Sequence, residues 1–136
     1  MSFKLLIDGV LQAGAGEIAV INPADETVIA LSAIASEQQL EQAVAAASRA
    51  LAGWSATAIE QRASCLQRLG ELVAEHEAEL YRLICLEVGR PLPLAHFEAQ
   101  LVQKSCAFYS QQRLDVDVVY EDEAVKVELH REPVGV

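Results

Sequence analysis

The chain has 136 residues, 52% of them hydrophobic, and its 10 basic and 20 acidic residues give a formal charge of −10. This length and apolar content allow one domain with its own core. The negative charge repels phosphate backbones and anionic membrane surfaces, so neither nucleic acid nor membrane is an expected partner. No apolar run approaches the ~18 residues of a membrane-spanning helix, and the first residues lack a secretory signal. We therefore predict a cytoplasmic protein.

The N-terminal region predicts two β-hairpins. Within residues 4–13, Asp8-Gly9 supplies the positive φ angles that a tight hairpin turn requires. Residues 18–21 and 27–34 are then rich in β-branched side chains and flank the turn Asn22-Pro23-Ala24-Asp25-Glu26. A pair of small hairpins is thus expected to open the fold.

The first predicted helix follows the second hairpin. Ser36, with Gln39 three residues later, forms a capping-box pattern, and apolar residues then recur at steps of three and four. This pattern predicts a helix over about residues 37–52 that ends near Gly53.

Two further helices are predicted, which makes three in series. Thr57 repeats the start signal and precedes a long apolar stripe, which predicts one long amphipathic helix with Gly89 and Pro91 as its stop. The next helix is expected after Pro93, and its pattern fails near Leu114.

The C-terminal region changes to a period of two. Residues 116–120 and 125–129 alternate apolar with polar side chains around the turn Glu121-Asp122-Glu123, which predicts a two-stranded ribbon. A ribbon of this kind is marginal alone. It either folds back on the helices or pairs with a missing segment or another subunit. The apolar Val134-Gly135-Val136 is typical of the start of another buried strand.

No complete active site is predicted from the residues themselves. Gly14-Ala15-Gly16 lacks the third glycine of a dinucleotide loop and precedes a strand, so we interpret it as a plain turn. The three cysteines are widely spaced, without a Cys-x-x-Cys pair, which favours reduced thiols over disulfides or zinc. They are Cys65, Cys85 and Cys106. The clustered carboxylates Glu75, Glu77 and Glu79 and the turn Glu121-Asp122-Glu123 could serve acid and base roles in a cleft, but they are interpreted as solvated charge.

Several short motifs occur in an order that resembles the aldehyde dehydrogenase superfamily over essentially the whole chain. The final heptad is the most specific of them. The motifs are the Asp8-Gly9 hairpin, Ile21-Asn22-Pro23, Trp54, Glu87-Val88-Gly89-Arg90-Pro91 and His130-Arg131-Glu132-Pro133-Val134-Gly135-Val136.

The resemblance implies that the parent protein has the α/β aldehyde dehydrogenase-like fold and oxidises an aldehyde to a carboxylic acid with NAD or NADP. This chain would be its α+β N-terminal segment. Residues 1–114 would form hairpins and helices of the cofactor-binding domain, residues 115–131 an oligomerisation ribbon, and residues 132–136 the start of the first cofactor-domain strand. The family's catalytic cysteine, its base glutamate and its cofactor loop lie beyond Val136, so no catalytic or cofactor-binding residue is assigned and no NAD is expected to bind this segment.

The resemblance also implies three roles for residues that are present. Glu98 and Val102 would lie near the entry path of a small aldehyde substrate. The backbone carbonyls of Ile21 and Glu87 would contribute to a monovalent cation site. Residues 116–130, from Val116 to His130, would join subunits of a homo-oligomer. The alternative of a different class is a stand-alone helical and β-arm interaction module without enzymatic activity.

Overall fold

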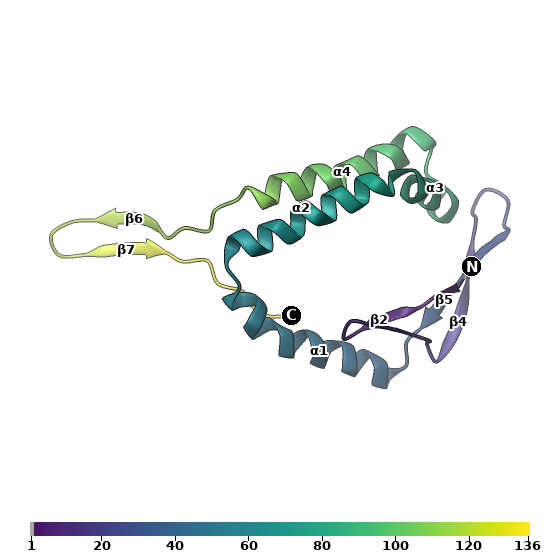
Figure 1. Cartoon of the computed structure of the whole chain (residues 1–136), viewed down its shortest axis with the longest axis horizontal. Coiled ribbons are helices and arrows are strands. Elements are labelled where there is room, and N and C mark those ends of the chain that lie inside the picture. Colours follow the sequence, from purple (N-terminus) through teal and green to yellow (C-terminus); the bar gives the residue numbers. More distant parts are fainter. Residues whose placement is uncertain (1) are drawn as a thin grey trace.

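The computed structural model describes residues 2–136 as an open arrangement of N-terminal strands, four helices and a projecting ribbon (Figure 1). The strands pair into one three-stranded and two two-stranded sheets. The elements in chain order are β1 Ser2–Phe3, β2 Leu5–Ile7, β3 Val10–Gln12, β4 Gly16–Ile21, β5 Val28–Ile34, α1 Glu37–Ala56, α2 Ile59–Glu75, α3 Glu77–Val88, α4 Leu92–Ser110, β6 Asp117–Glu121 and β7 Lys126–Leu129.

Both predicted hairpins are confirmed. Strands β2 and β3 pair antiparallel around Asp8 and Gly9, whose φ angles of 52° and 77° are those of a tight primed turn. Strands β4 and β5 also pair antiparallel, with a register shift beside Val20 and Ile21. Strand β1 adds to β5 in parallel, a long-range pairing that the local pattern did not predict.

The capping box at the start of α1 is confirmed, but the predicted end of the helix is wrong. The Ser36 hydroxyl accepts the Gln39 amide at 3.2 Å, and the Gln39 side chain accepts the Ser36 amide at 3.0 Å. The helix runs through Gly53 to Ala56, because one interior glycine costs only about 1 kcal/mol. Thr57 closes this helix, since its hydroxyl donates to the Gly53 carbonyl at 2.9 Å.

The single long helix predicted after Thr57 is also wrong. It is divided at His76, which has φ −105° and ψ 13°, so the chain has four helices where three were predicted. Helix α2 starts after Ala58 without a side-chain cap, which means that Thr57 does not start it. Gly89 does end α3, in the left-handed conformation with φ 71°. The last helix begins at Leu92, slightly earlier than predicted, and ends at Ser110.

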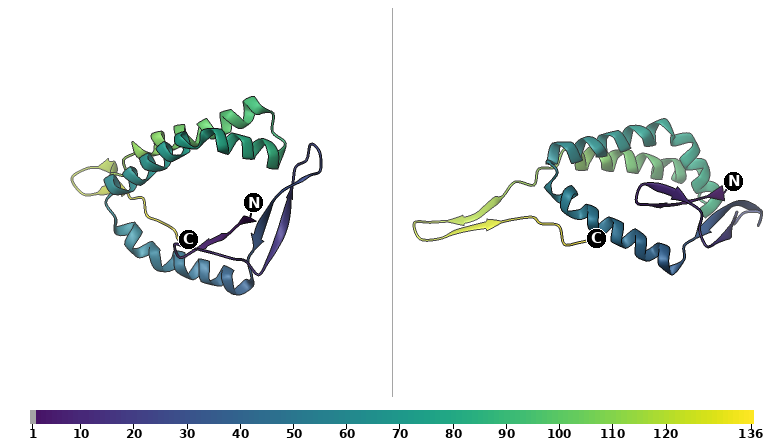
Figure 2. Two further views of the ribbon diagram at one scale, coloured as in Figure 1. Left: turned by 45° about the vertical axis from the view of Figure 1, so that its right-hand side comes forward. Right: turned by 60° about the horizontal axis from the view of Figure 1, so that its bottom comes forward.

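Helices α2 and α4 pack closely against each other and run side by side in all views (Figures 1 and 2). An added Cβ at Gly70 would stand 3.2 Å from the Cys106 Cβ, and Ala95 and Ala99 are fully or almost fully buried. Helix α3 joins the same pair, because its Glu77 contacts His96 of α4 at 2.8 Å. The core of the chain is therefore built on small side chains.

The ribbon of β6 and β7 projects away from the helices in Figures 1 and 2, and all of its residues are exposed. The first alternative, that the ribbon folds back on the helices, is therefore wrong. Residues 130–136 follow without regular secondary structure, so the strand expected there stays a prediction. No helix within residues 2–136 has the length and apolar character needed to cross a membrane.

Replacing Gly89 by Ala is expected to destabilise the chain. The substitution places a Cβ at positive φ and 2.8 Å from the Pro23 ring, so the free energy of unfolding should fall by at least about 1–2 kcal/mol. Gly53→Ala is the matched control: it lies within α1 with nothing near its Cβ and should gain about 0.5–1 kcal/mol. Urea unfolding followed by circular dichroism measures both. Equal effects of the two variants would contradict the assignment of Gly89 as a left-handed cap.

Candidate functional site

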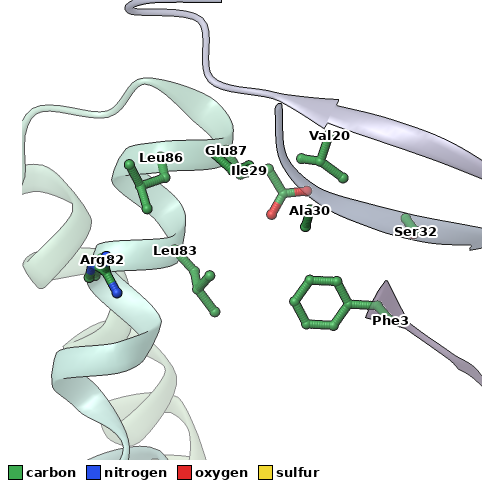
Figure 3. Close-up of a pocket in the computed structure, with 9 residues that line it drawn as sticks. All are labelled: Phe3, Val20, Ile29, Ala30, Ser32, Arg82, Leu83, Leu86 and Glu87. Carbon is green, nitrogen blue, oxygen red and sulfur yellow. The ribbon is translucent and has the colours of Figure 1, made fainter. Parts of the chain in front are cut away.

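A cavity of about 390 Å³ separates α3 from the N-terminal sheet. In Figure 3, Leu83 of α3 and Phe3 of β1 point toward each other across it, and Glu87 extends from α3 toward β5. Its walls are mainly apolar, with a hydroxyl, a guanidinium and a carboxylate among them. The lining residues are Phe3, Val20, Ile29, Ala30, Ser32, Arg82, Leu83, Leu86 and Glu87.

The two residues predicted as cation ligands lie on adjoining segments of this region. Glu87 lines the cavity together with Val20, the neighbour of Ile21 in β4. Two residues further along, Gly89 packs against Pro23 in the turn that follows Ile21. The fold thus brings the end of α3 against the end of β4. Cation binding by the backbone carbonyls of Ile21 and Glu87 stays a prediction.

The turn after Ile21 is held by its own polar side chains. The carbonyl oxygen of the buried Asn22 side chain accepts the Ala24 amide at 3.0 Å, and the Asn22 backbone pairs with Thr27 and Glu26 at 2.8 Å each. One Asp25 carboxylate oxygen accepts the Thr27 hydroxyl at 2.7 Å and the Thr27 amide at 3.0 Å. The hydroxyl first, and then the amide, lower the pKa of Asp25.

The predicted substrate-entrance residues share one groove. Glu98 and Val102 project from α4 into an apolar groove of about 360 Å³ beside α2, which also contains Leu66, Leu101, Ser105, Cys106 and Tyr109. The Glu98 carboxylate is ion-paired with Arg90, 2.9 Å from its Nε. Sequence reasoning missed this pairing, because Arg90 lies outside α4 and no helical spacing relates it to Glu98. A role of Glu98 or Val102 in aldehyde entry stays a prediction.

The Gly14-Ala15-Gly16 segment does not form a phosphate-binding loop. The Ala15 amide donates to the Ile34 carbonyl at 2.8 Å, and an added Cβ at Gly14 would stand 2.4 Å from that same oxygen. Gly16 begins a strand, whereas a dinucleotide site needs a helix N-terminus at this point. The backbone donors are thus used in sheet pairing, and a dinucleotide does not fit here.

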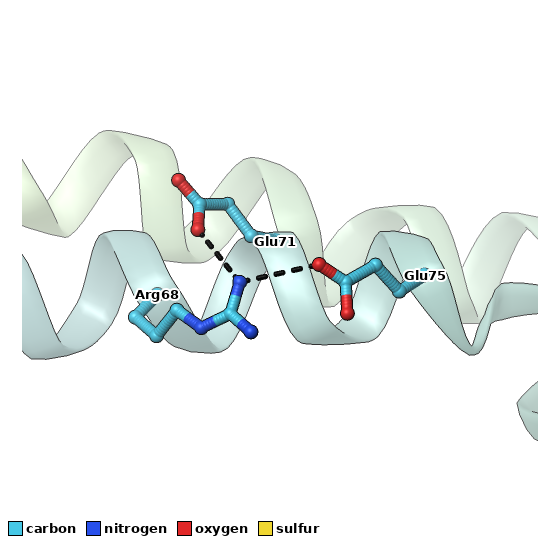
Figure 4. A network of polar contacts seen from close by, with 3 residues as sticks. All are labelled: Arg68, Glu71 and Glu75. Carbon is cyan, nitrogen blue, oxygen red and sulfur yellow. Dashed lines mark hydrogen bonds and ion pairs between the residues drawn. The ribbon is translucent and has the colours of Figure 1, made fainter.

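Of the carboxylates predicted to cluster, Glu75, Glu79 and the turn Glu121-Asp122-Glu123 are exposed, whereas Glu77 is half-buried and lies 2.8 Å from His96 of α4. Arg68 Nη1 contacts Glu71 at 3.0 Å and Glu75 at 3.2 Å on the outer side of α2, with all three side chains more than half exposed (Figure 4). Asp122 instead holds the ribbon turn, because it accepts the Tyr120 hydroxyl and the amides of the two residues before β7. Arg68 and the ribbon turn thus engage their carboxylates in exposed ion pairs and turn hydrogen bonds. Within residues 2–136, no group of three His, Cys, Asp or Glu side chains could hold a metal ion.

Removing the Thr27 hydroxyl is expected to raise the pKa of Asp25 toward its ordinary value. The folded-state pKa is lowered, so this contact stabilises the turn above the unfolded-state pKa and is lost as pH falls through the folded value. An NMR titration of the Asp25 carboxyl should give a higher pKa in Thr27→Val than in Thr27→Ser, which keeps the hydroxyl. Identical titrations of both variants would refute this origin of the shift.

The chain is similar in sequence to curated aldehyde dehydrogenases. It is 43% identical over 90 residues to an N-succinylglutamate 5-semialdehyde dehydrogenase of Chromobacterium violaceum, covering 65% of this chain and 18% of that protein. It is 33% identical over 135 residues to a 3-succinoylsemialdehyde-pyridine dehydrogenase of a Pseudomonas species, covering 98% of this chain and 28% of that protein. The chain thus spans between about a sixth and three tenths of the length of these relatives.

The fold agrees with these sequence matches. A crystal structure of a NAD-dependent benzaldehyde dehydrogenase from Corynebacterium glutamicum superposes with a TM-score of 0.74 at 29% identity, over 89% of this chain and 27% of that one. The sequence pattern of the aldehyde dehydrogenase family matches residues 10–136, which include the α3–β4 junction, the α2–α4 groove and the ribbon. By this match over nearly its whole length, the chain belongs to the aldehyde dehydrogenase family.

Proposed function

We propose that this chain is the N-terminal part of a cytoplasmic enzyme that oxidises an aldehyde to a carboxylic acid with NAD+ or NADP+. The family match over residues 10–136 carries the proposal. The names of the relatives support oxidation of aldehydes as a class, but they refer to chemically different aldehydes. The activity is proposed for a longer polypeptide, since this chain spans only a fraction of its relatives.

The chain's own contribution to this activity is support for the substrate path. Arg90 holds the Glu98 carboxylate at the edge of the α2–α4 groove, and Val102 adds an apolar wall one helical turn away. A carboxylate fixed in this way can orient a polar group of an entering aldehyde, whereas an apolar wall contacts its carbon chain. The dinucleotide would supply hydride acceptance, and its site would lie on other segments, because the Gly14-Ala15-Gly16 segment does not fit it.

Catalysis is expected only when this chain is joined to the remainder of a dehydrogenase. A chimera of this chain with the complementary part of the Pseudomonas relative should reduce NAD+ or NADP+ in the presence of an aldehyde, measured by absorbance of the reduced cofactor. The 136-residue chain alone should give no turnover and no calorimetric binding of the dinucleotide. A folded chimera that binds the cofactor without turnover, or a chain that turns over alone, would contradict the proposal.

The ribbon is expected to join copies of the protein. Its apolar residues on β6 and β7 are exposed and have no cover within residues 2–136, and contiguous exposed apolar surface favours association. Val127→Lys should therefore reduce the apparent mass in light scattering at high concentration. Glu123→Gln in the adjacent turn makes the same change of one charge unit and should leave the mass unaltered. A monomeric parent chain would argue against this role of the ribbon.

A further inference from the structure

The hairpin of β2 and β3 lies against α1 and is bonded to it at both of its ends. At the hairpin tip, Arg49 Nη2 contacts the Asp8 carboxylate at 3.1 Å. At the opposite end, where the chain leaves β3, the amide nitrogen of the Gln39 side chain donates to the Ala13 carbonyl at 2.9 Å. Both contacts join residues that are far apart in sequence, so they determine where the hairpin lies on the helix.

The spacing of these contacts is the same on the helix and on the hairpin. About 15 Å of helical rise separates Gln39 from Arg49 on α1. The chain from Asp8 to Ala13 covers at most about 16–18 Å when it is extended. Strand β3 therefore lies along the axis of α1 and runs antiparallel to it, with a polar contact near each end.

The surface between these contacts is built from small side chains. Ile7 of the hairpin and Ala46 of α1 are both buried where the two elements meet. The other α1 residues that line this junction are Ala43, Ala47 and Ala50. A helix face of single methyl groups allows a close approach but has little relief to fix the position of a strand on it. The polar contacts at the ends must therefore supply that position.

Gln39 makes two different bonds with one side chain. Its carbonyl oxygen accepts the Ser36 amide at 3.0 Å in the capping box, and its nitrogen donates to Ala13. The adjoining chain is tightly placed, because an added Cβ at Gly14 would stand 2.4 Å from the Ile34 carbonyl oxygen. Glutamate at position 39 would complete the same capping box, but it has no donor for the Ala13 carbonyl.

We propose that Gln39 is a clasp that couples the start of α1 to the position of the β2–β3 hairpin. The capping bond holds the side chain in the orientation that reaches Ala13, and the Ala13 contact in turn holds the bond to Ser36 closed. Loss of the side-chain nitrogen alone leaves the helix start intact and releases the base of the hairpin, which keeps its contact with Arg49. The Gly14-Ala15-Gly16 segment thereby gains a task, because its close approach to β5 brings the Ala13 carbonyl to the helix start.

Gln39→Glu removes the donor and keeps the capping acceptor. In residue-resolved amide hydrogen exchange, the paired amides of β2 and β3 should exchange about two- to tenfold faster than in the parent chain, as expected for loss of one hydrogen bond, whereas the Ser36 amide should keep its protection. The matched control is Gln38→Glu, which adds the same charge to the same helical turn. The Gln38 side chain is exposed and has no bond within residues 2–136, so this control should leave hairpin exchange unchanged.

Gln39→Ala separates the two bonds, because it removes both of them. It should speed exchange of the hairpin amides and of the Ser36 amide together. Equal hairpin exchange in the Gln39→Glu and Gln38→Glu chains would overturn the proposal, since the hairpin would then not depend on the Gln39 nitrogen. A Ser36 amide that exchanges as fast in Gln39→Glu as in Gln39→Ala would also overturn it, because the helix start would then have been lost as well.

Discussion

The close approach of α2 and α4 is the contact on which the helical part of the chain depends. It is possible because Gly70 faces Cys106 without a side chain of its own and because Ala95 and Ala99 fill the buried side of α4 with single methyl groups. Within residues 2–136, no large side chain is fully buried. Helices α2 and α4 are therefore held by close backbone packing, and helix α3 packs against both of them. The ribbon projects away, and the N-terminal hairpin of β2 and β3 contacts α1 instead.

Because few side chains are buried, the chain has an unusually large solvent-accessible surface. The chain exposes 10164 Å², whereas a compact monomer of 14.7 kDa exposes roughly 6900 Å². In a standard protein interface, each partner contributes about 800 Å² of surface. The excess surface of this chain is several times larger. Much of it belongs to α1, where Leu40, Val44 and Trp54 are about half exposed, and to the ribbon. These faces have the character of interior surfaces that need a cover.

Local chemistry predicted much of the secondary structure, because the deciding residues are close together in sequence. Asp8-Gly9 and the Ser36–Gln39 capping box fix a turn and a helix start with their own backbone and side-chain bonds. The helix breaks at His76, although no glycine or proline near this position predicts a break. There the helix changes course so that Glu77 meets His96 on α4, a tertiary contact that no local pattern contains.

The candidate sites were predictable to different extents for the same reason. Glu98 and Val102 are four residues apart on one helix, so their shared groove follows from helical spacing. The Arg90 partner of Glu98 and the Ala13 partner of Gln39 depend on how separate elements meet. Neither could be identified from spacing alone.

Residue-resolved amide hydrogen exchange tests most directly whether the chain has a small packed core of α2 and α4, with α1 and the ribbon left uncovered. The amides of α2 and α4 around Gly70 and Ala99 should exchange slowest, and those of α1 and of the ribbon much faster. Uniform slow exchange over all four helices and the ribbon would contradict this account, because it would mean that the chain folds as one evenly stabilised unit.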